Sequence, residues 1–271
     1  MTLFQAFVLG LVQGLTEFFP ISSSGHLALV PRFLGWHFYG GNTFAFNVLV
    51  QVGTLVAVIG YFWRDLEQIA VAWLRGLWRR QPWATLEARM GWYLILATLP
   101  AVVGGLLLQH RVEAAFSNPR AVGFFLLLTA LLLFSADRLG RQKRAWAQFQ
   151  GKDALTMGFF QVLALFPGVS RSGSTIAGGM YRHLDRPTAA RFSFLMSVPV
   201  MLGAGALALV DLFRQPQPAS ATLAPLMVGF LTAAVSGYLS IRWLLRYLVR
   251  HNLTVFAVYC AVLGLTALLL F

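Results

Sequence analysis

The chain has 271 residues, of which 58% are hydrophobic and only 11% are charged. A soluble domain is usually about 45–50% apolar and about 25% charged, so this composition excludes a disordered chain and argues strongly against a soluble globule. A membrane-crossing helix needs roughly 20 apolar residues, so the length corresponds to ~8–10 helical segments. In a membrane protein the net charge of +12 is interpreted from the distribution of basic residues among the loops, because that distribution reports orientation. We therefore expect no nucleic-acid partner.

Two kinds of apolar stretch occur along the chain. Six are long enough to cross a bilayer: residues 43–63, 91–109, 121–137, 190–211, 222–241 and 253–271. Residues 3–30 and 154–181 are instead interrupted near the middle by Pro, Gly and Ser clusters. Irregular backbone at membrane depth occurs only where protein or a water-filled cavity satisfies its polar groups. The sequence therefore predicts an all-α polytopic membrane protein, one domain over residues 1–271, with six transmembrane helices and two re-entrant helical hairpins.

The basic residues predict the orientation. Sixteen of the 21 Lys and Arg residues lie in segments 64–90, 138–152, 182–191 and 242–250. Basic loops are normally cytoplasmic. The opposite loops, 31–42, 110–120 and 212–221, carry four. We therefore assign the basic segments to the cytoplasm and the opposite loops to the outside. With six spans in alternating directions, both termini then lie outside, the first hairpin enters from the outer face, and the second enters from the cytoplasm.

The two broken stretches are related to each other in sequence. A shift of 148 residues superimposes Gly10 on Gly158, Gln13 on Gln161, Phe18 on Phe166, Ser22 on Ser170, Ser24 on Ser172 and Gly25 on Gly173. Two related hairpins that enter from opposite faces describe an inverted-topology repeat, in which broken helices meet near the midplane. We predict repeat halves of approximately 1–137 and 153–271.

Serines follow the break in both hairpins. Ser22 to Ser24 come after Pro20, and Ser170 follows Pro167 and Gly168 at the equivalent place. Serine is a preferred N-cap, and a helix N-terminus presents unpaired N–H groups that attract phosphate. Arg171 lies inside the second turn, where its planar guanidinium could hold phosphate oxygens bidentately. The two turns together predict an anion site.

The first hairpin carries different chemistry. Glu17, four residues after Gln13, is the only carboxylate before Asp65, and His26 follows the serine cluster. A lone acid in an apolar hairpin costs several kcal/mol unless it is paired, so it indicates function. A carboxylate, serines, a histidine and an arginine match the requirements of phosphoryl transfer to a hydroxyl nucleophile. Gln13 and Gln161 could equally be interhelical hydrogen-bonding residues.

Two motifs carry a family resemblance. Residues 13–26, QGLTEFFPISSSGH, and 167–175, PGVSRSGST, resemble the two signature motifs of the bacterial undecaprenyl-diphosphate phosphatase family associated with bacitracin resistance. The resemblance covers the whole chain in length and span layout. It implies a membrane enzyme that removes the terminal phosphate of undecaprenyl diphosphate and so recycles the lipid carrier for cell-wall synthesis.

The resemblance also implies site residues. By position, it assigns catalytic roles to Glu17, Ser23, His26 and Arg171. The expected diphosphate-binding residues are Gln13, Ser22, Ser24, Gly25, Ser170, Ser172, Gly173 and Thr175. Glu17 would activate Ser23 directly or through His26, and Ser23 would attack phosphorus or orient water.

A divalent cation, Mg²⁺ or Ca²⁺, is expected from the resemblance alone. Family members carry Glu or Gln at the position of Gln13, and this chain has the amide, so Glu17 is the one carboxylate of the first hairpin that could bind the ion. The expected substrate is a polyprenyl diphosphate lipid. The expected location is the bacterial cytoplasmic (inner) membrane with a site open to the periplasmic side, and monomer and homodimer both stay open.

A carrier is the alternative from another functional class. Secondary transporters also build substrate sites from inverted repeats with discontinuous helices, so the chain could move an anionic lipid or solute without cleaving it. Release of inorganic phosphate from a polyprenyl diphosphate separates the two hypotheses.

Overall fold

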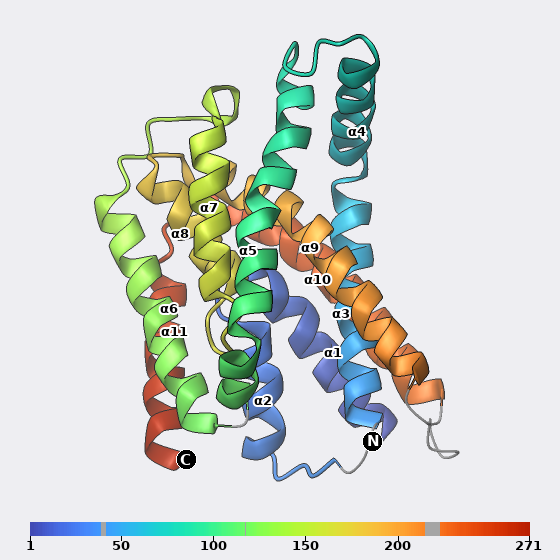
Figure 1. Cartoon of the computed structure of the whole chain (residues 1–271). Coiled ribbons are helices and arrows are strands. Elements are labelled where there is room, and N and C mark those ends of the chain that lie inside the picture. The colour runs from blue at the N-terminus through green and yellow to red at the C-terminus, as the bar shows by residue number, and fades with distance from the viewer. Residues whose placement is uncertain (39–41, 117, 215–222) are drawn as a thin grey trace.

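The computed structural model describes residues 1–38, 42–116, 118–214 and 223–271 and is helical (Figure 1). Its α-helices are α1 (Leu3–Phe18), α2 (Ser23–Phe33), α3 (Asn42–Tyr61), α4 (Trp63–Trp78), α5 (Leu86–Phe116), α6 (Pro119–Leu139), α7 (Gly151–Leu163), α8 (Arg171–Tyr181), α9 (Arg186–Arg214), α10 (Leu223–Leu248) and α11 (Thr254–Leu270). A short 3₁₀ turn, Trp146–Gln148, precedes α7.

Five of the described helices are long and apolar enough to cross a membrane: α3, α5, α6, α9 and α10. They match five of the six predicted spans. The sixth expected span, residues 253–271, forms α11, an apolar helix of 17 residues. Large apolar side chains face outward along the bundle, for example Leu107 at 78% and Leu207 at 71% exposed. Lipid, and not water, suits such a surface, so the chain is a polytopic α-helical membrane protein.

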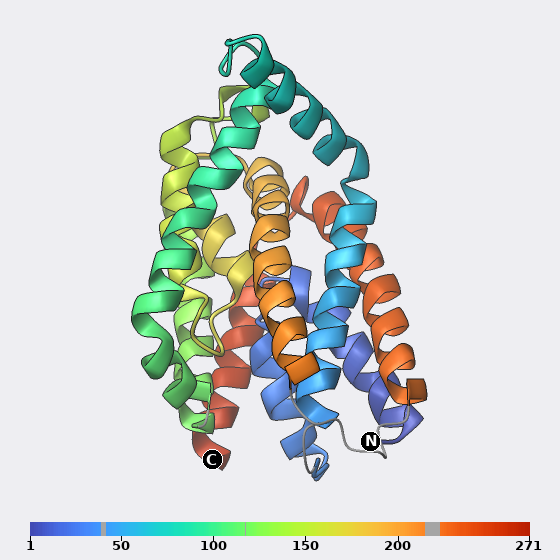
Figure 2. The ribbon, with the colours of Figure 1, turned by 45° about the vertical axis from the view of Figure 1, so that its right-hand side comes forward.

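The basic segment 64–90 is more ordered than a loop. Its first part forms α4, which extends beyond the end of α3 and turns back into α5 (Figures 1 and 2). Asp65 of α4 forms an ion pair with Arg191 of α9, and Ile69 is buried. Apolar residues recur among the arginines of this segment at helical spacing. Counting charges alone conceals that periodicity.

Two helical hairpins enter the bundle from opposite ends. The α1–α2 hairpin starts at the end that holds both termini, and the α7–α8 hairpin starts at the other end (Figure 1). Their second helices, α2 and α8, have 11 residues each, about half of a span. Both hairpins turn inside the bundle, so their breaks lie in its interior.

The halves of the chain are interlocked. Helix α1 packs along α10, and α7 packs along α5, so each hairpin lies against a helix of the other half. Helix α6 of the first half packs along α11 of the second. This exchange positions the hairpin turns next to each other.

A buried acid anchors the second hairpin at its basic end. Asp153, in the first turn of α7, accepts hydrogen bonds from Arg144 at 2.9 and 2.7 Å and from Arg182 at 3.1 Å. It also accepts from the backbone N–H of Gln150, as an N-terminal acid should. The hydrogen bonds that Arg144 donates to Asp153 raise the pKa of Arg144 above its ordinary value. The cluster fixes where α7 enters the bundle.

Candidate active site

Both hairpin turns end in a serine N-cap. The Ser22 Oγ accepts the Gly25 N–H at 3.2 Å, and the Ser170 Oγ accepts the Gly173 N–H at 3.0 Å. The predicted caps are therefore confirmed. Ser22 has φ of 71°, a left-handed conformation that a non-glycine residue adopts only where surrounding contacts impose it.

The two turns touch through equivalent residues. A Cβ at Gly25 would lie 3.4 Å from the Cα of Gly168, and a Cβ at Gly173 would lie 3.3 Å from the Cβ of Pro20. The shift of 148 residues that carries Gly25 onto Gly173 also carries Pro20 onto Gly168. These reciprocal contacts bring the N-termini of α2 and α8 to one place.

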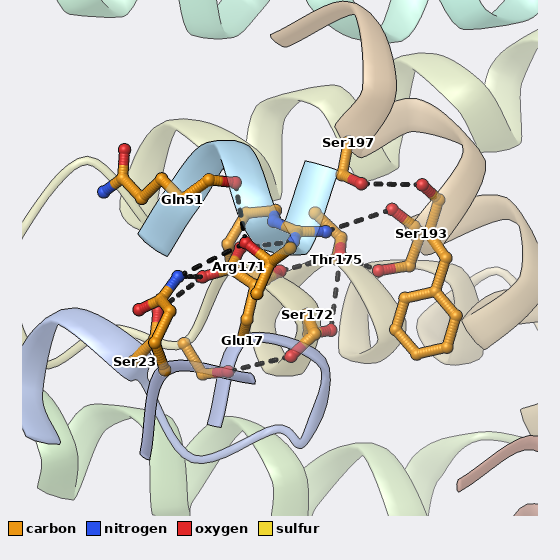
Figure 3. A network of polar contacts seen from close by, with 12 residues as sticks. Glu17, Ser23, Gln51, Arg171, Ser172, Thr175, Ser193 and Ser197 are labelled. Atoms are coloured by element: carbon orange, nitrogen blue, oxygen red, sulfur yellow. Dashed lines mark hydrogen bonds and ion pairs between the residues drawn. The ribbon is translucent and has the colours of Figure 1, made fainter. Parts of the chain in front are cut away.

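Glu17 lies between the two turns (Figure 3). Its Oε2 accepts the Ser23 hydroxyl at 2.6 Å, and its Oε1 accepts Arg171 Nη2 at 2.7 Å. Gln13 Nε2 also donates to Oε2, at 3.1 Å, and to Thr54 Oγ1 at 3.4 Å. The side chains of Glu17 and Arg171 are only 12% and 15% exposed. The structure thus brings together three of the four expected catalytic residues, Glu17, Ser23 and Arg171. Glu17 and Arg171 are 154 residues apart in the chain and come from different hairpins.

A cavity of about 370 Å³ opens at this ion pair. Its polar lining residues are Thr16, Glu17, Ser22, Ser23, Ser24, Gln51, Ser170 and Arg171. Its other wall is apolar and comes from α3, α5, the turn after α7 and α9, with Leu55, Phe116, Leu165 and Met201 among the residues. Because the N-termini of α2 and α8 both border the polar wall, the cavity suits an anionic group attached to an apolar chain.

Several expected diphosphate ligands lie behind the cavity wall. Ser172 donates to the Phe19 carbonyl at 3.0 Å, and Thr175 shares a 2.7 Å hydrogen bond with Ser193 of α9. Neither residue lines the cavity, and Gln13, Gly25 and Gly173 do not line it either. The structure gives Ser172 and Thr175 the task of fixing α8 against its neighbours, while Arg171 Nη1 reaches the Ser193 carbonyl at 3.3 Å.

His26 is turned away from the cavity. Its Nδ1 lies 2.7 Å from the Ser22 carbonyl oxygen, and its Nε2 lies 2.7 Å from the hydroxyl of Tyr259 in α11. His26 is 6% exposed, and its imidazole stacks on the Tyr259 ring. Its ring nitrogens bind Ser22 and Tyr259 and not Ser23, so the geometry favours direct activation of Ser23 by Glu17 over a route through His26.

The sequence interpretation missed Gln51, Ser193 and Tyr259. Gln51 lines the cavity from α3, and Ser193 positions Arg171 from α9 (Figure 3). An amide within the apolar stretch 43–63 was a signal that could have indicated Gln51. No sequence pattern distinguishes Ser193 or Tyr259 from other residues of their spans.

The donor set does not fit a divalent cation held by the protein. Hard cations prefer several oxygen ligands, among them carboxylates. Among the described residues of the cavity wall, Glu17 is the one carboxylate, and its oxygens already bind Ser23 and Arg171. Gln13 Oε1 is a buried oxygen with no partner in the described part of the chain, and one amide does not complete a site. Among the residues that the structure describes, no three His, Cys, Asp or Glu side chains cluster to bind a metal.

Fold and site together define a class: a polytopic membrane protein with a cavity between two helical hairpins, whose polar wall suits an anionic group. Comparison with known families makes this class specific. The model of the family described as bacitracin resistance protein BacA matches residues 6–266. This chain belongs to that bacterial BacA, or undecaprenyl-diphosphatase, family of multi-pass membrane proteins.

Individual relatives resemble the chain over nearly its full length. An undecaprenyl-diphosphatase from Gemmatimonas aurantiaca is 47% identical over 266 residues, covering 98% of this chain and 96% of the relative. Proteins with the same description from Chlorobium phaeovibrioides and Myxococcus xanthus are 43% and 42% identical. The alignments with these two cover all of this chain and 97% and 89% of the respective relatives.

Proposed function

We propose that the chain hydrolyses undecaprenyl diphosphate to undecaprenyl phosphate and inorganic phosphate, and so recycles the lipid carrier of cell-wall synthesis. The observation that carries this proposal is the Glu17 carboxylate, which binds the Ser23 hydroxyl with one oxygen and Arg171 with the other. Full-length relatives described as undecaprenyl-diphosphatases support the same activity. The cavity has a polar wall for the diphosphate and an apolar wall for the first part of the prenyl chain.

The geometry supports a serine nucleophile. Ser23 Oγ forms a bond to the terminal phosphorus, the bond from phosphorus to the bridging oxygen breaks, and undecaprenyl phosphate leaves. Glu17 Oε2, 2.6 Å from the hydroxyl, takes the proton of Ser23. Water then attacks the phosphorus of the phosphoserine, and the bond from phosphorus to Ser23 Oγ breaks. Glu17 returns its proton to Ser23 Oγ, and the carboxylate so freed accepts the proton lost by the water, so that inorganic phosphate is released.

Arg171 and the helix N-termini stabilise the transferred phosphoryl group. A guanidinium has five N–H donors, and Glu17 and the Ser193 carbonyl each engage one. The remaining donors can bind the equatorial oxygens as charge shifts in the transition state. Free backbone N–H groups at the starts of α2 and α8 add partial positive charge on the same side.

We further propose that the two halves, 1–137 and 153–271, form an inverted-topology repeat with six transmembrane helices and two re-entrant hairpins. The reciprocal contacts of the turns and the opposite entry of the hairpins support this arrangement (Figure 1). Phe116 and Gly205 line the cavity and lie toward the ends of α5 and α9 away from the basic segments. The positive-inside rule then orients the site toward the periplasmic face of the cytoplasmic membrane.

The deciding experiment measures phosphate release from a polyprenyl diphosphate by the purified protein in detergent. We expect release by the wild-type protein and its loss in Ser23→Ala. A folded wild-type protein that binds the lipid but releases no phosphate would contradict the proposal and favour a carrier. Trapping of ³²P on Ser23 from a terminally labelled substrate tests the phosphoserine, because a serine that only orients water acquires no label.

A further inference from the structure

A helix outside the two hairpins supports the reactive turn. Tyr259 and Cys260, consecutive residues of α11, both contact the segment between α1 and the first turn of α2. The Tyr259 hydroxyl lies 2.7 Å from His26 Nε2, and the Cys260 thiol lies 3.7 Å from the Pro20 carbonyl oxygen. Helix α11 is thereby connected to both ends of the segment that carries Ser22 and Ser23.

The contact with the Ser22 carbonyl determines the tautomer of His26. A carbonyl oxygen can only accept, so Nδ1, at 2.7 Å from it, must carry the ring proton. In the neutral imidazole Nε2 is then an acceptor, and the Tyr259 hydroxyl donates to it. The chain of hydrogen bonds runs in one direction, from Tyr259 through His26 to the Ser22 carbonyl.

That carbonyl belongs to the strained residue of the site. Ser22 has φ of 71° and ψ of 99°, and its carbonyl also accepts the His26 backbone N–H at 3.2 Å. Ser23 follows directly and donates to Glu17 at 2.6 Å. The peptide unit that contains the Ser22 carbonyl joins Ser22 to Ser23. A rotation of this unit would therefore move Ser23 Oγ away from Glu17 Oε2.

We propose that Tyr259 is a positioning residue for this reaction, acting through His26 to keep the Ser22 peptide in its left-handed conformation and Ser23 aligned with Glu17. The inference rests on the proposed phosphatase function. It assigns His26 to alignment of the nucleophile and not to proton transfer, since both of its ring nitrogens are occupied and the ring does not line the cavity.

The test is a double-mutant cycle on kcat, with Tyr259→Phe, His26→Ala and the double variant. We expect each single variant to lower kcat about tenfold, the effect of one lost hydrogen bond in the transition-state geometry, with KM changed less than about twofold. The double variant should be no slower than the slower single one, because both remove the same connection.

Tyr181→Phe is the matched control. The Tyr181 hydroxyl makes a hydrogen bond of similar length, 2.6 Å, to Ser135 Oγ, far along α8 from the turn. The Tyr181→Phe variant should have an unchanged kcat, and its thermal stability should change about as much as that of Tyr259→Phe. This comparison decides the matter even if His26→Ala does not fold, because Tyr259→Phe preserves the ring.

Three results would overturn the proposal. One is a kcat for Tyr259→Phe equal to that of the Tyr181→Phe control. Another is a loss of about 10³-fold in His26→Ala beside a near-normal Tyr259→Phe, which would make His26 a catalytic residue. The third is full additivity in the cycle. An inactive wild-type protein would instead contradict the proposed function, so the two failures are distinguishable.

Discussion

The two hairpins have related sequences and similar helix lengths, but three of the equivalent positions at which they differ carry different chemistry. Under the shift of 148 residues, Ser23 corresponds to Arg171, Glu17 to Leu165, and His26 to Ser174. Ser23 and Arg171 are each the first residue of a capped helix, and they bind the two oxygens of one carboxylate. Two hairpins that enter from opposite ends therefore bring a hydroxyl group and a cation to the same carboxylate.

Glu17 and Leu165, which occupy equivalent positions, show a second consequence of the sequence difference between the hairpins. Both residues line the cavity, the acid on its polar wall and the leucine on its apolar wall. The asymmetry in sequence thus becomes an asymmetry in the cavity, which a lipid diphosphate requires. The asymmetry also leaves one half-buried negative charge, Glu17, facing one positive charge, Arg171, and such pairing makes ionised groups tolerable at membrane depth.

Among the substitutions that test this comparison of the two hairpins, removal of the proposed base, Glu17, should lower phosphate release the most. Glu17→Gln retains size and hydrogen bonding but cannot take a proton, so phosphate release should fall by about 10²–10⁴-fold. Steady-state release from a polyprenyl diphosphate measures it, with a thermal-shift assay to show that the variant is folded. Glu87→Gln, in the basic segment, is the control and should retain activity. Near-normal turnover of Glu17→Gln would refute the mechanism.

Substitution of the cation in the second hairpin should have the next largest effect. Arg171→Lys retains the charge but loses the planar fork, so kcat should fall by about 10²-fold with a smaller change in KM. The same assay and stability check apply. A folded variant with unchanged kcat and only a raised KM would assign Arg171 to uniform substrate binding.

Substitution of the equivalent glutamines, Gln13 and Gln161, should affect activity in the first hairpin and only stability in the second. Gln13 donates to Glu17, whereas both amide atoms of Gln161 are buried without a partner in the described part of the chain. Gln13→Met should lower kcat about tenfold through the lost hydrogen bond. Gln161→Met should leave kcat unchanged and raise the free energy of unfolding by about 1 kcal/mol, since an unpaired polar group leaves the core. Equal losses of activity in both variants would end the comparison.

The orientation of the hairpins can be tested without any change in activity. Single cysteines at Gln142 and His110, in a Cys260→Ser background, should react with a membrane-impermeant thiol reagent in intact cells only at position 110. Gln217, which the sequence would also indicate as an outer position, lies outside the described residues. Labelling at position 142 alone would invert the topology and place the site toward the cytoplasm.

Sequence patterns indicated the three residues that the structure brings together, because each of them breaks a local rule. Glu17 is a charge in an apolar hairpin, Arg171 lies among small residues, and the serines follow helix breaks. Those departures from the expected pattern depend on near neighbours alone, so no contact had to be known. The N-caps and five of the spans follow from the same local information.

Features that depend on distant contacts were not predictable. The direction of His26 is determined by Tyr259, 233 residues later in the chain, and the position of Arg171 depends on Ser193. The helical character of segment 63–78 was concealed by its arginines, although its apolar spacing is regular. Local pattern thus identifies which groups are unusual, and tertiary packing determines where they point.

The interlocked packing has a consequence for synthesis of the protein. Glu17 enters the membrane early, but Arg171 is 154 residues away, and α10, along which α1 packs, is made later still. At about 5–20 residues per second the carboxylate waits roughly 10–30 s for its cation. The nascent first hairpin must spend that interval at the insertion machinery or in contact with water, and Glu17 can become a fixed part of the bilayer interior only when the second hairpin arrives.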